Sequence, residues 1–297
     1  GPVSTAAMLR ASPPLWRRDG RDWPHRDTSR FVRAEGLEWH VQVTGSGPVA
    51  LLLHGAGGAS HSWRGLIPLL AEHYTVVVPD LPGHGFTGTP PDPGLALPAM
   101  ARRLSGLVSA LGEAPSLGIG HSAGAAILMQ MALDGRTAPQ KIVGINPALS
   151  PFRGLPGLVL PAMARALHWN PLAAYLISVA AIDPNAVPVL IRGMGSRIDA
   201  EGLRLYTRLL RCPGHVAGTV GMMAAWDLDP LWAALPELTL PVLVLAGESD
   251  RAVPPSLSSE AAERLAAARL HPLPGLGHLA HEEDPETVAA EILAFAL

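Results

Sequence analysis

Hydrophobic residues in this chain gather in short, nearly unbroken runs that alternate with longer amphipathic stretches. Runs of this kind predict strands buried on both faces; they are Val49–Leu53, Thr75–Val78, Leu117–Gly120, Lys141–Ile145, Val242–Ala246 and Arg269–Leu273. The amphipathic stretches predict helices, and these are Trp63–Glu72, Leu97–Leu111, Ala125–Leu133, Leu257–Ala267 and Glu286–Leu297. The alternation predicts an α/β fold with a mostly parallel central sheet and helices on both faces. Its active site is expected at the carboxyl edge of the strands.

The pattern changes in two places. Phe31–Ala34 and Leu37–Val43 predict a hairpin that turns at Glu35 and Gly36. Between Pro147 and Leu240 the strands stop, and helical runs punctuated by prolines follow. We therefore expect an N-terminal arm over residues 1–30, a first core part over 31–146, a helical lid over 147–240 and a second core part over 241–297.

The sequence Gly120-His121-Ser122-Ala123-Gly124 lies where a predicted strand meets a predicted helix. Gly-x-Ser-x-Gly in that context is typical of a nucleophile elbow, a sharp turn that exposes the serine hydroxyl. The two outer glycines are expected because side chains there would collide with the neighbouring strand or helix. With 31 glycines in the chain, the motif needs partners to be specific.

Candidate partners follow in the chain. Asp250 lies on the loop after the strand Val242–Ala246, and His278 lies on a Gly/Pro loop after the last strand. The order serine, acid, histidine is that of α/β-hydrolases. We predict Ser122 as nucleophile, His278 as base and Asp250 as the carboxylate that orients it.

Backbone N–H groups for an oxyanion hole are expected in two places. The loop His54-Gly55-Ala56-Gly57-Gly58 follows a strand, and the N–H of Ala56 is one candidate. The N–H of Ala123, directly after the serine, is the other.

Competing residues are given other roles. We interpret His54, His84, His121 and His281 as structural, because none follows the final strand directly, and Asp80 as a residue that organises its loop. Asp227 and Asp229 remain alternative carboxylates, whereas Asn146 holds a position where some hydrolases carry their acid.

Several segments resemble the α/β-hydrolase superfamily: LLLHGAGG, VVVPDLPGHGFT, GHSAGA, LVLAGESDRAVPP and LPGLGHLAHEEDP. The resemblance runs from Phe31 to the end and implies the α/β-hydrolase fold with a helical lid insertion. Ser122 at the elbow sets the chain apart from the dehalogenases and epoxide hydrolases of this fold, which attack with a carboxylate.

Further segments are similar to the magnesium-chelatase accessory proteins of bacteriochlorophyll biosynthesis. They are RDWPHRDTSRFVRAEGLEWHVQVTGSGPV, GHSAGAAIL, MALDGR, IDAEGLRLY and GMMAAWDLDPL. This resemblance implies a role near magnesium insertion, a tetrapyrrole ester or similar apolar substrate, and association with magnesium chelatase.

Residues of the lid segment give the only other indication of substrate. Large apolar side chains there suit a flat macrocycle or a long acyl group; the candidates for contact are Trp169, Tyr175, Met222, Met223 and Trp226. The alternative is that they pack the lid on the core. Arg204, Arg208 and Arg211 share one helix face, either to receive substrate carboxylates or as a solvated surface.

Composition excludes several classes. A net charge of −3 argues against a nucleic-acid partner. The histidines and acids lack metal-ligand spacing, and no dinucleotide or phosphate-binding motif is present, so we predict neither a metal nor a cofactor. The single cysteine, Cys212, is expected to be structural.

The N-terminal arm is locally basic, with arginines and two tryptophans, Trp16 and Trp23. It either contacts an anionic membrane surface or acidic partner, or lies on the domain with the tryptophans as anchors. Arginines interrupt the first apolar segment, so we expect no signal peptide and a cytoplasmic protein at most peripheral to the photosynthetic membrane.

Three functions remain open. The first is a serine esterase, the second a non-catalytic porphyrin-binding accessory protein, and the third a general carboxylesterase or carbon–carbon hydrolase with the same triad.

Overall fold

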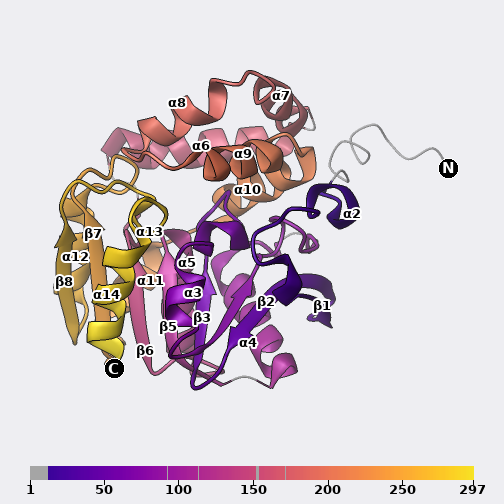
Figure 1. Cartoon of the computed structure of the whole chain (residues 1–297). Coiled ribbons are helices and arrows are strands. Elements are labelled where there is room, and N and C mark those ends of the chain that lie inside the picture. Colours follow the sequence, from indigo (N-terminus) through magenta and orange to yellow (C-terminus); the bar gives the residue numbers. More distant parts are fainter. Residues whose placement is uncertain (1–12, 92, 113, 152–153, 171) are drawn as a thin grey trace.

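An eight-stranded sheet forms the centre of the computed structural model, which describes residues 13–91, 93–112, 114–151, 154–170 and 172–297 (Figure 1). The strands are β1 (Ser29–Ala34), β2 (Leu37–Gly45), β3 (Val49–Leu53), β4 (Thr75–Pro79), β5 (Pro115–His121), β6 (Lys141–Ile145), β7 (Val242–Gly247) and β8 (Ala268–Leu273). Their order in space is β1-β2-β4-β3-β5-β6-β7-β8. The predicted strands are confirmed, with ends that differ by a few residues.

Strands β3 to β8 are parallel to one another, and the β1–β2 and β2–β4 pairs are antiparallel. The turn between β1 and β2 is the predicted one: Glu35 and Gly36 both have positive φ, at 53° and 73°, as a two-residue hairpin turn of the favoured hand requires.

Helices cover both faces of the sheet, and each strand sends alternate side chains to the two sides. Leu51 and Leu53 of β3 join one core cluster, whereas Ala50 and Leu52 join the other. The first face carries α4 (Leu97–Leu111), α5 (Ala123–Asp134) and α12 (Pro255–Arg264), and the second carries α3 (Ile67–Leu70) and α14 (Pro285–Ala296).

One predicted helix is wrong. Residues 63–72 form a 3-10 turn, η2 (Ser60–Trp63), followed by the short helix α3, instead of one continuous helix. Gly65 separates the two, and a β-carbon there would press on Pro285. Pro68 then lies in the first turn of α3, where proline is tolerated. The apolar period is preserved, since Trp63, Leu66, Ile67 and Leu70 are all buried.

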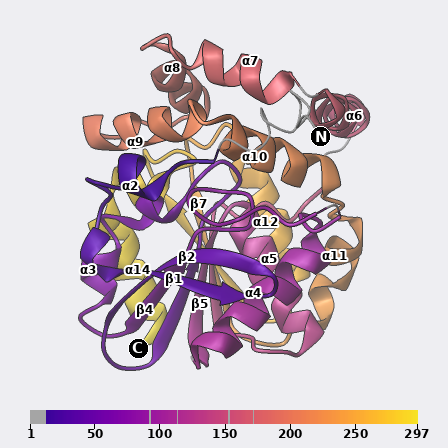
Figure 2. The ribbon, with the colours of Figure 1, turned by 90° about the vertical axis from the view of Figure 1, so that its right-hand side faces the viewer.

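A helical insertion is defined here as the helices between β6 and β7; its helices before α11 (Asp229–Ala234) form an outer layer over the carboxyl edge of the sheet (Figures 1 and 2). Its helices are α6 (Gly154–Trp169), α7 (Ala173–Ala180), α8 (Ala186–Gly193), α9 (Ala200–Leu210), α10 (Pro213–Ala225) and α11. The last of these packs on α5, and its Leu231 belongs to the main core.

The described part of the N-terminal arm lies on the domain. It contains the short helix α2 (Trp16–Asp19), and Trp23 is only 2% exposed. The indole N–H of Trp23 donates to Ser60 Oγ at 3.0 Å. The expectation that tryptophans anchor the arm is confirmed from residue 13 on; residues 1–12 lie outside the described part.

Candidate active site

Ser122 stands between β5 and α5 in a backbone conformation that serine rarely adopts, with φ 52° and ψ −115°. Its N–H donates to Ile145 O at 3.0 Å, and its own carbonyl accepts from Ala125 and Ala148 at 3.2 and 3.1 Å. These bonds to β6, to α5 and to the segment after β6 hold the turn. Ser122 therefore has the strained backbone that is typical of a nucleophile elbow.

The two outer glycines of the motif are required by close packing. A β-carbon at Gly124 would overlap the carbonyl of Leu53 at the end of β3, and one at Gly120 would overlap the backbone of Ala125. The expected collision with strand on one side and helix on the other is what the structure shows.

Asp250 and His278 are joined. His278 Nδ1 lies 2.9 Å from Asp250 Oδ2, and both residues are buried. The other oxygen, Oδ1, accepts from the N–H groups of Ala252 and Val253 at 2.8 and 2.9 Å. A carboxylate only accepts, so Nδ1 carries the proton and Nε2 is left as the basic nitrogen of the neutral ring.

The loop that carries His278 lies against the turn that carries Ser122. His121, beside Ser122, donates from Nε2 to His278 O at 2.7 Å, and the two rings are 4.7 Å apart between centroids. Burial is the main reason that the pKa of His121 lies well below its ordinary value. His121 is thus a neutral supporting group, in agreement with the structural role expected for it.

Asn146 joins the loop of His278 to the end of β7, a role that the sequence did not reveal. It follows β6, has φ 46° and is fully buried. Its Nδ2 donates to Gly277 O and His278 O, both at 2.9 Å, while its Oδ1 accepts from Gly247 N at 2.7 Å. The only indication in the sequence was its place after a strand, where some hydrolases carry the acid.

The loop after β3 adjoins the serine. A β-carbon at Gly55 would lie 3.2 Å from Ser122 Cβ. The carbonyl of Gly55 accepts from His54 Nδ1 at 2.7 Å and from Gly58 N at 3.1 Å. Because the peptide is planar and trans, the N–H of Ala56 points the opposite way from that carbonyl. Ala123 begins α5, so its N–H has no partner within the helix.

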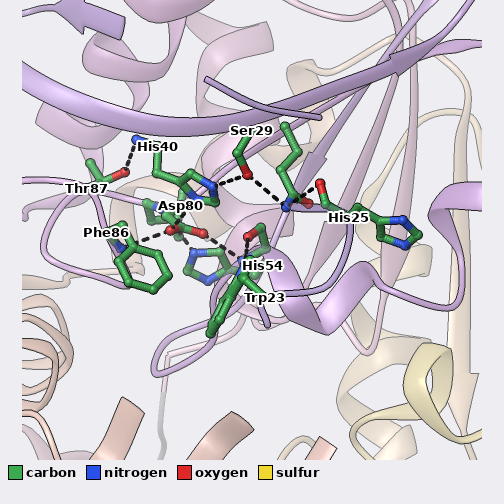
Figure 3. Close-up of polar contacts among 12 residues, drawn as sticks. Trp23, His25, Ser29, His40, His54, Asp80, Phe86 and Thr87 are labelled. Carbon is green, nitrogen blue, oxygen red and sulfur yellow. Dashed lines mark hydrogen bonds and ion pairs between the residues drawn. The ribbon is translucent and has the colours of Figure 1, made fainter. Parts of the chain in front are cut away.

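Asp80 organises the loops beneath this site, as expected (Figure 3). Its carboxylate accepts from Ser60 N at 2.7 Å and Phe86 N at 3.0 Å, and it pairs with His40 Nδ1 at 2.8 Å. Burial alone would raise the pKa of Asp80, but His40 and the backbone donors outweigh it and hold the pKa below its usual range.

The helical insertion contacts the loops that carry Asp250 and His278, another feature not foreseen. The carbonyl of Met194, just after α8, accepts from Arg251 N and His278 N at 3.2 and 3.3 Å. Ser196 Oγ accepts from Leu279 N at 2.8 Å and donates to Glu283 Oε1 at 2.5 Å. The loop of Asp250, the loop of His278 and the helical insertion are therefore joined by hydrogen bonds.

The five predicted substrate contacts are not brought together. Trp169, Tyr175 and Met223 are exposed, at 71%, 43% and 54%. Met222 is buried in the main core, and Trp226 packs beside it with its indole N–H on Leu95 O. None of the five lines the cavity of about 210 Å³ between α6, α7 and α10.

The arginine row on α9 binds the chain itself. Arg204 and Arg208 pair with Asp22 of the arm at 2.5 and 2.6 Å, and Arg211 donates to Ala181 O and Ile182 O. The hydrogen bond from Arg208 is the first reason that the pKa of Asp22 lies below its usual range. Two arginines of the row thus pair with the arm at the surface, where Arg204 is still about half exposed.

Cys212 is buried, and its Sγ contacts Arg208 O at 3.4 Å. Burial raises the pKa of its thiol to about 11. A thiol with a pKa this high stays protonated near neutral pH, which fits the structural role expected for it.

Comparisons with known proteins agree with this geometry. The model of the Alpha/beta hydrolase family matches residues 50–291. A magnesium-chelatase 30 kDa subunit of Rhodobacter capsulatus is 43% identical over 274 residues, covering 92% of this chain and 95% of that protein. A pimeloyl-acyl-carrier protein methyl ester esterase of Xylella fastidiosa is 30% identical over 254 residues, covering 80% and 91%.

Among solved structures, an epoxide hydrolase without ligand matches with a TM-score of 0.75 at 25% identity, covering 90% of this chain and 98% of that one. Together, the family match, the sheet order and the strained serine between β5 and α5 show that this chain belongs to the α/β-hydrolase family.

Proposed function

We propose that the protein is a serine hydrolase that cleaves an ester-like bond, with Ser122, His278 and Asp250 as its triad. The observation that carries this proposal is the 2.9 Å bond between His278 and Asp250, together with the contact between the loop of His278 and His121, the neighbour of strained Ser122. That bond fixes the tautomer a general base needs.

In the proposed reaction, His278 takes the proton of the Ser122 hydroxyl as Oγ bonds to the ester carbonyl carbon. The negative charge that develops on the carbonyl oxygen is stabilised by the N–H groups of Ala56 and Ala123. The carbon–oxygen bond to the leaving alcohol then breaks, and His278 returns the proton to that alcohol. Water, deprotonated by the same histidine, then bonds to the acyl carbon. The bond from that carbon to Oγ breaks, the acid leaves, and His278 returns the proton to Oγ of Ser122.

A fluorophosphonate probe tests this assignment, because it reacts with activated serines. Wild-type protein should be labelled once, and Ser122→Ala should not be labelled. His278→Ala should slow labelling by roughly a thousandfold, the scale on which removing a triad residue acts. An unlabelled wild type, or a labelled Ser122→Ala, would contradict the proposal.

We further propose a tetrapyrrole ester as substrate. Support comes from the name of the relative at 43% identity, a magnesium-chelatase subunit, and from the resemblance seen in the N-terminal and insertion segments. A metal ion in such a macrocycle would be part of the substrate. Association with magnesium chelatase belongs to the same proposal.

Titration with protoporphyrin, its magnesium complex and the methyl ester of that complex tests the substrate class. We expect saturable quenching of tryptophan fluorescence with a Kd of about 1 μM or lower. Absence of quenching by all three, together with turnover of simple aliphatic esters, would leave a general carboxylesterase.

The second candidate is a non-catalytic tetrapyrrole-binding accessory protein. It is favoured by the fact that the relative at 43% identity is named as a subunit of a chelatase and not as an esterase. Complementation of a deletion strain separates the two: if Ser122→Ala restores pigment synthesis as well as wild type does, binding is the function. Loss of complementation by that variant supports hydrolysis.

A further inference from the structure

Unlike most surface helices, α7 buries small side chains and exposes large apolar ones. The side chains that it buries are small, namely Ala173, Ala174 and Ser178, and Ala181 follows as the cap. Its large side chains face outward: Leu176 is 58% exposed, and Ile182, just beyond the helix, is 61% exposed. A helix normally buries its large apolar side chains, since that burial is what stabilises it on the domain.

We define the outer apolar face as Trp169, Leu172, Tyr175, Leu176, Val179 and Ile182, all of them exposed. In both views α7 and α8 form the layer of the insertion farthest from the sheet (Figures 1 and 2). Val189 and Leu190 of α8 are exposed as well. Single exposed apolar residues are ordinary, but such a concentration on one layer marks an interaction surface.

The chemistry of this face favours lipid over protein. Among the described residues from 172 to 182, the hydroxyl of Tyr175 is the only polar group on an exposed side chain. Protein interfaces of standard size use about ten hydrogen bonds, which this face does not supply. Trp169 and Tyr175 combine an apolar ring with a polar tip, as residues at a membrane interface do.

Charge around the face points to anionic lipid. The exposed charged side chains on the described parts of α6, α7 and α8 are Arg165 and Arg192, and Asp183 is the acidic one between α7 and α8. A bilayer that carries negative headgroups attracts such a surface. No helix among the described residues is long and apolar enough to cross a membrane, so contact would be peripheral.

We propose that the outer apolar face docks on an anionic lipid surface, with α7 lying in the plane of the interface. The cavity of about 210 Å³ lies directly beneath, because Leu167 and Ala174 line it from α6 and α7 while Gly218 lines it from α10. Docking brings this cavity next to the acyl chains, from which an apolar molecule can enter it. The inference rests on none of the chemistry proposed for Ser122.

Cosedimentation with vesicles of equal parts phosphatidylglycerol and phosphatidylcholine tests the proposal. Wild type should bind, and bind more weakly to pure phosphatidylcholine. Leu176→Glu combined with Ile182→Glu should weaken binding at least about tenfold, because two exposed apolar anchors become charges. The matched control is Leu270→Glu, which changes an exposed leucine on β8 and should bind like wild type.

A second measurement does not depend on the folding of the double variant. The fluorescence of Trp169 is obtained as the emission of wild type minus that of Trp169→Phe. It should shift to the blue when the mixed vesicles are added. Ser122→Ala should bind vesicles as wild type does, which separates docking from hydrolysis.

Three outcomes would overturn the inference: no cosedimentation of wild type, equal binding by the double variant, or an unshifted Trp169 emission. Self-association of wild type that the double variant abolishes, without vesicle binding, would instead assign the face to a second copy of the chain. Retention of purified chelatase subunits by this face, again without vesicle binding, would assign it to that protein.

Discussion

The backbone at Ser122 costs free energy to hold. A non-glycine residue in such a conformation costs on the order of 1–3 kcal/mol. The hydrogen bonds of Ser122 to Ile145, Ala125 and Ala148 fix the turn in compensation. The residue that extends this support to the rest of the triad is Asn146, because its side chain reaches both the end of β7 and the loop of His278.

We expect Asn146→Ala to slow fluorophosphonate labelling of Ser122 by about a hundredfold, the scale on which a displacement of about 1 Å acts. The Gly277 carbonyl loses its side-chain donor, the His278 carbonyl keeps only the one from His121, and the buried Gly247 N–H loses its acceptor. The free energy of unfolding should therefore also fall by about 1–3 kcal/mol. The labelling rate and urea unfolding measure the two effects.

Asn185→Ala is the matched control, because Asn185 caps α8 on the surface without a side-chain hydrogen bond to the helix. It should label at the wild-type rate. Wild-type labelling by Asn146→Ala would show that Asn146 does not position the base.

At the scale of elements, α9 is joined to the core by buried polar contacts. Tyr206 Oη donates to Glu282 Oε2 at 2.6 Å, and Arg64 Nη1 binds Oε1 of the same carboxylate at 2.5 Å. Burial raises the pKa of Glu282 in spite of these donors. On its other side α9 holds the arm through Asp22. By contrast, α7 contacts its surroundings mainly through small side chains.

We expect Tyr206→Phe to lower the free energy of unfolding by about 1.5–3 kcal/mol, because a buried carboxylate loses a donor. Tyr175→Phe on exposed α7 is the control and should change it by less than about 0.5 kcal/mol. Urea unfolding measures both variants. Equal, small effects would mean that the bond between α9 and Glu282 contributes nothing to stability.

At the scale of the whole molecule, many buried histidines make the fold sensitive to acid. Burial is the first cause that lowers the pKa of His215 to about 4 and that of His281 to about 3. The pKa values of His54, His61 and His84 are lowered for the same reason. In the unfolded chain each histidine titrates near its ordinary value of about 6.5.

Below that value the unfolded state therefore binds more protons than the folded state. Stability is fully present above about pH 6.5 and is lost as the pH falls toward about 4, by up to about 1.4 kcal/mol per pH unit for each such histidine. Urea midpoints should accordingly fall steeply from about pH 7 to about pH 5.

His215→Gln isolates one contribution to this slope. His215 Nδ1 accepts from Gly85 N and Nε2 donates to Gly57 O, both at 2.9 Å, and a glutamine amide offers the same pair of functions without titrating. The slope of unfolding free energy against pH is set by the number of protons taken up on unfolding. We expect that number to fall by about one in the variant. An unchanged slope would mean that His215 is not buried in its neutral form.

The sequence by itself determined the fold class, nearly every strand and the three triad candidates. Strand periodicity, the Gly-x-Ser-x-Gly turn and the loops that carry Asp250 and His278 are local signals, since each depends on residues close together in the chain. The exception is at residues 63–72, where the apolar period is kept but the helix is interrupted at Gly65, which lies close to distant Pro285.

Tertiary structure decided how distant segments share one site. Asn146 bonds to His278, which lies 132 residues later in the chain. Met194 of the insertion bonds to the loops of both Asp250 and His278. The side of a helix that is buried also depends on its neighbours: Trp169 and Tyr175 face outward although their apolar character suggested a pocket. Hydrophobicity predicts that a side chain avoids water, but only the packing of the whole chain determines which surface covers it.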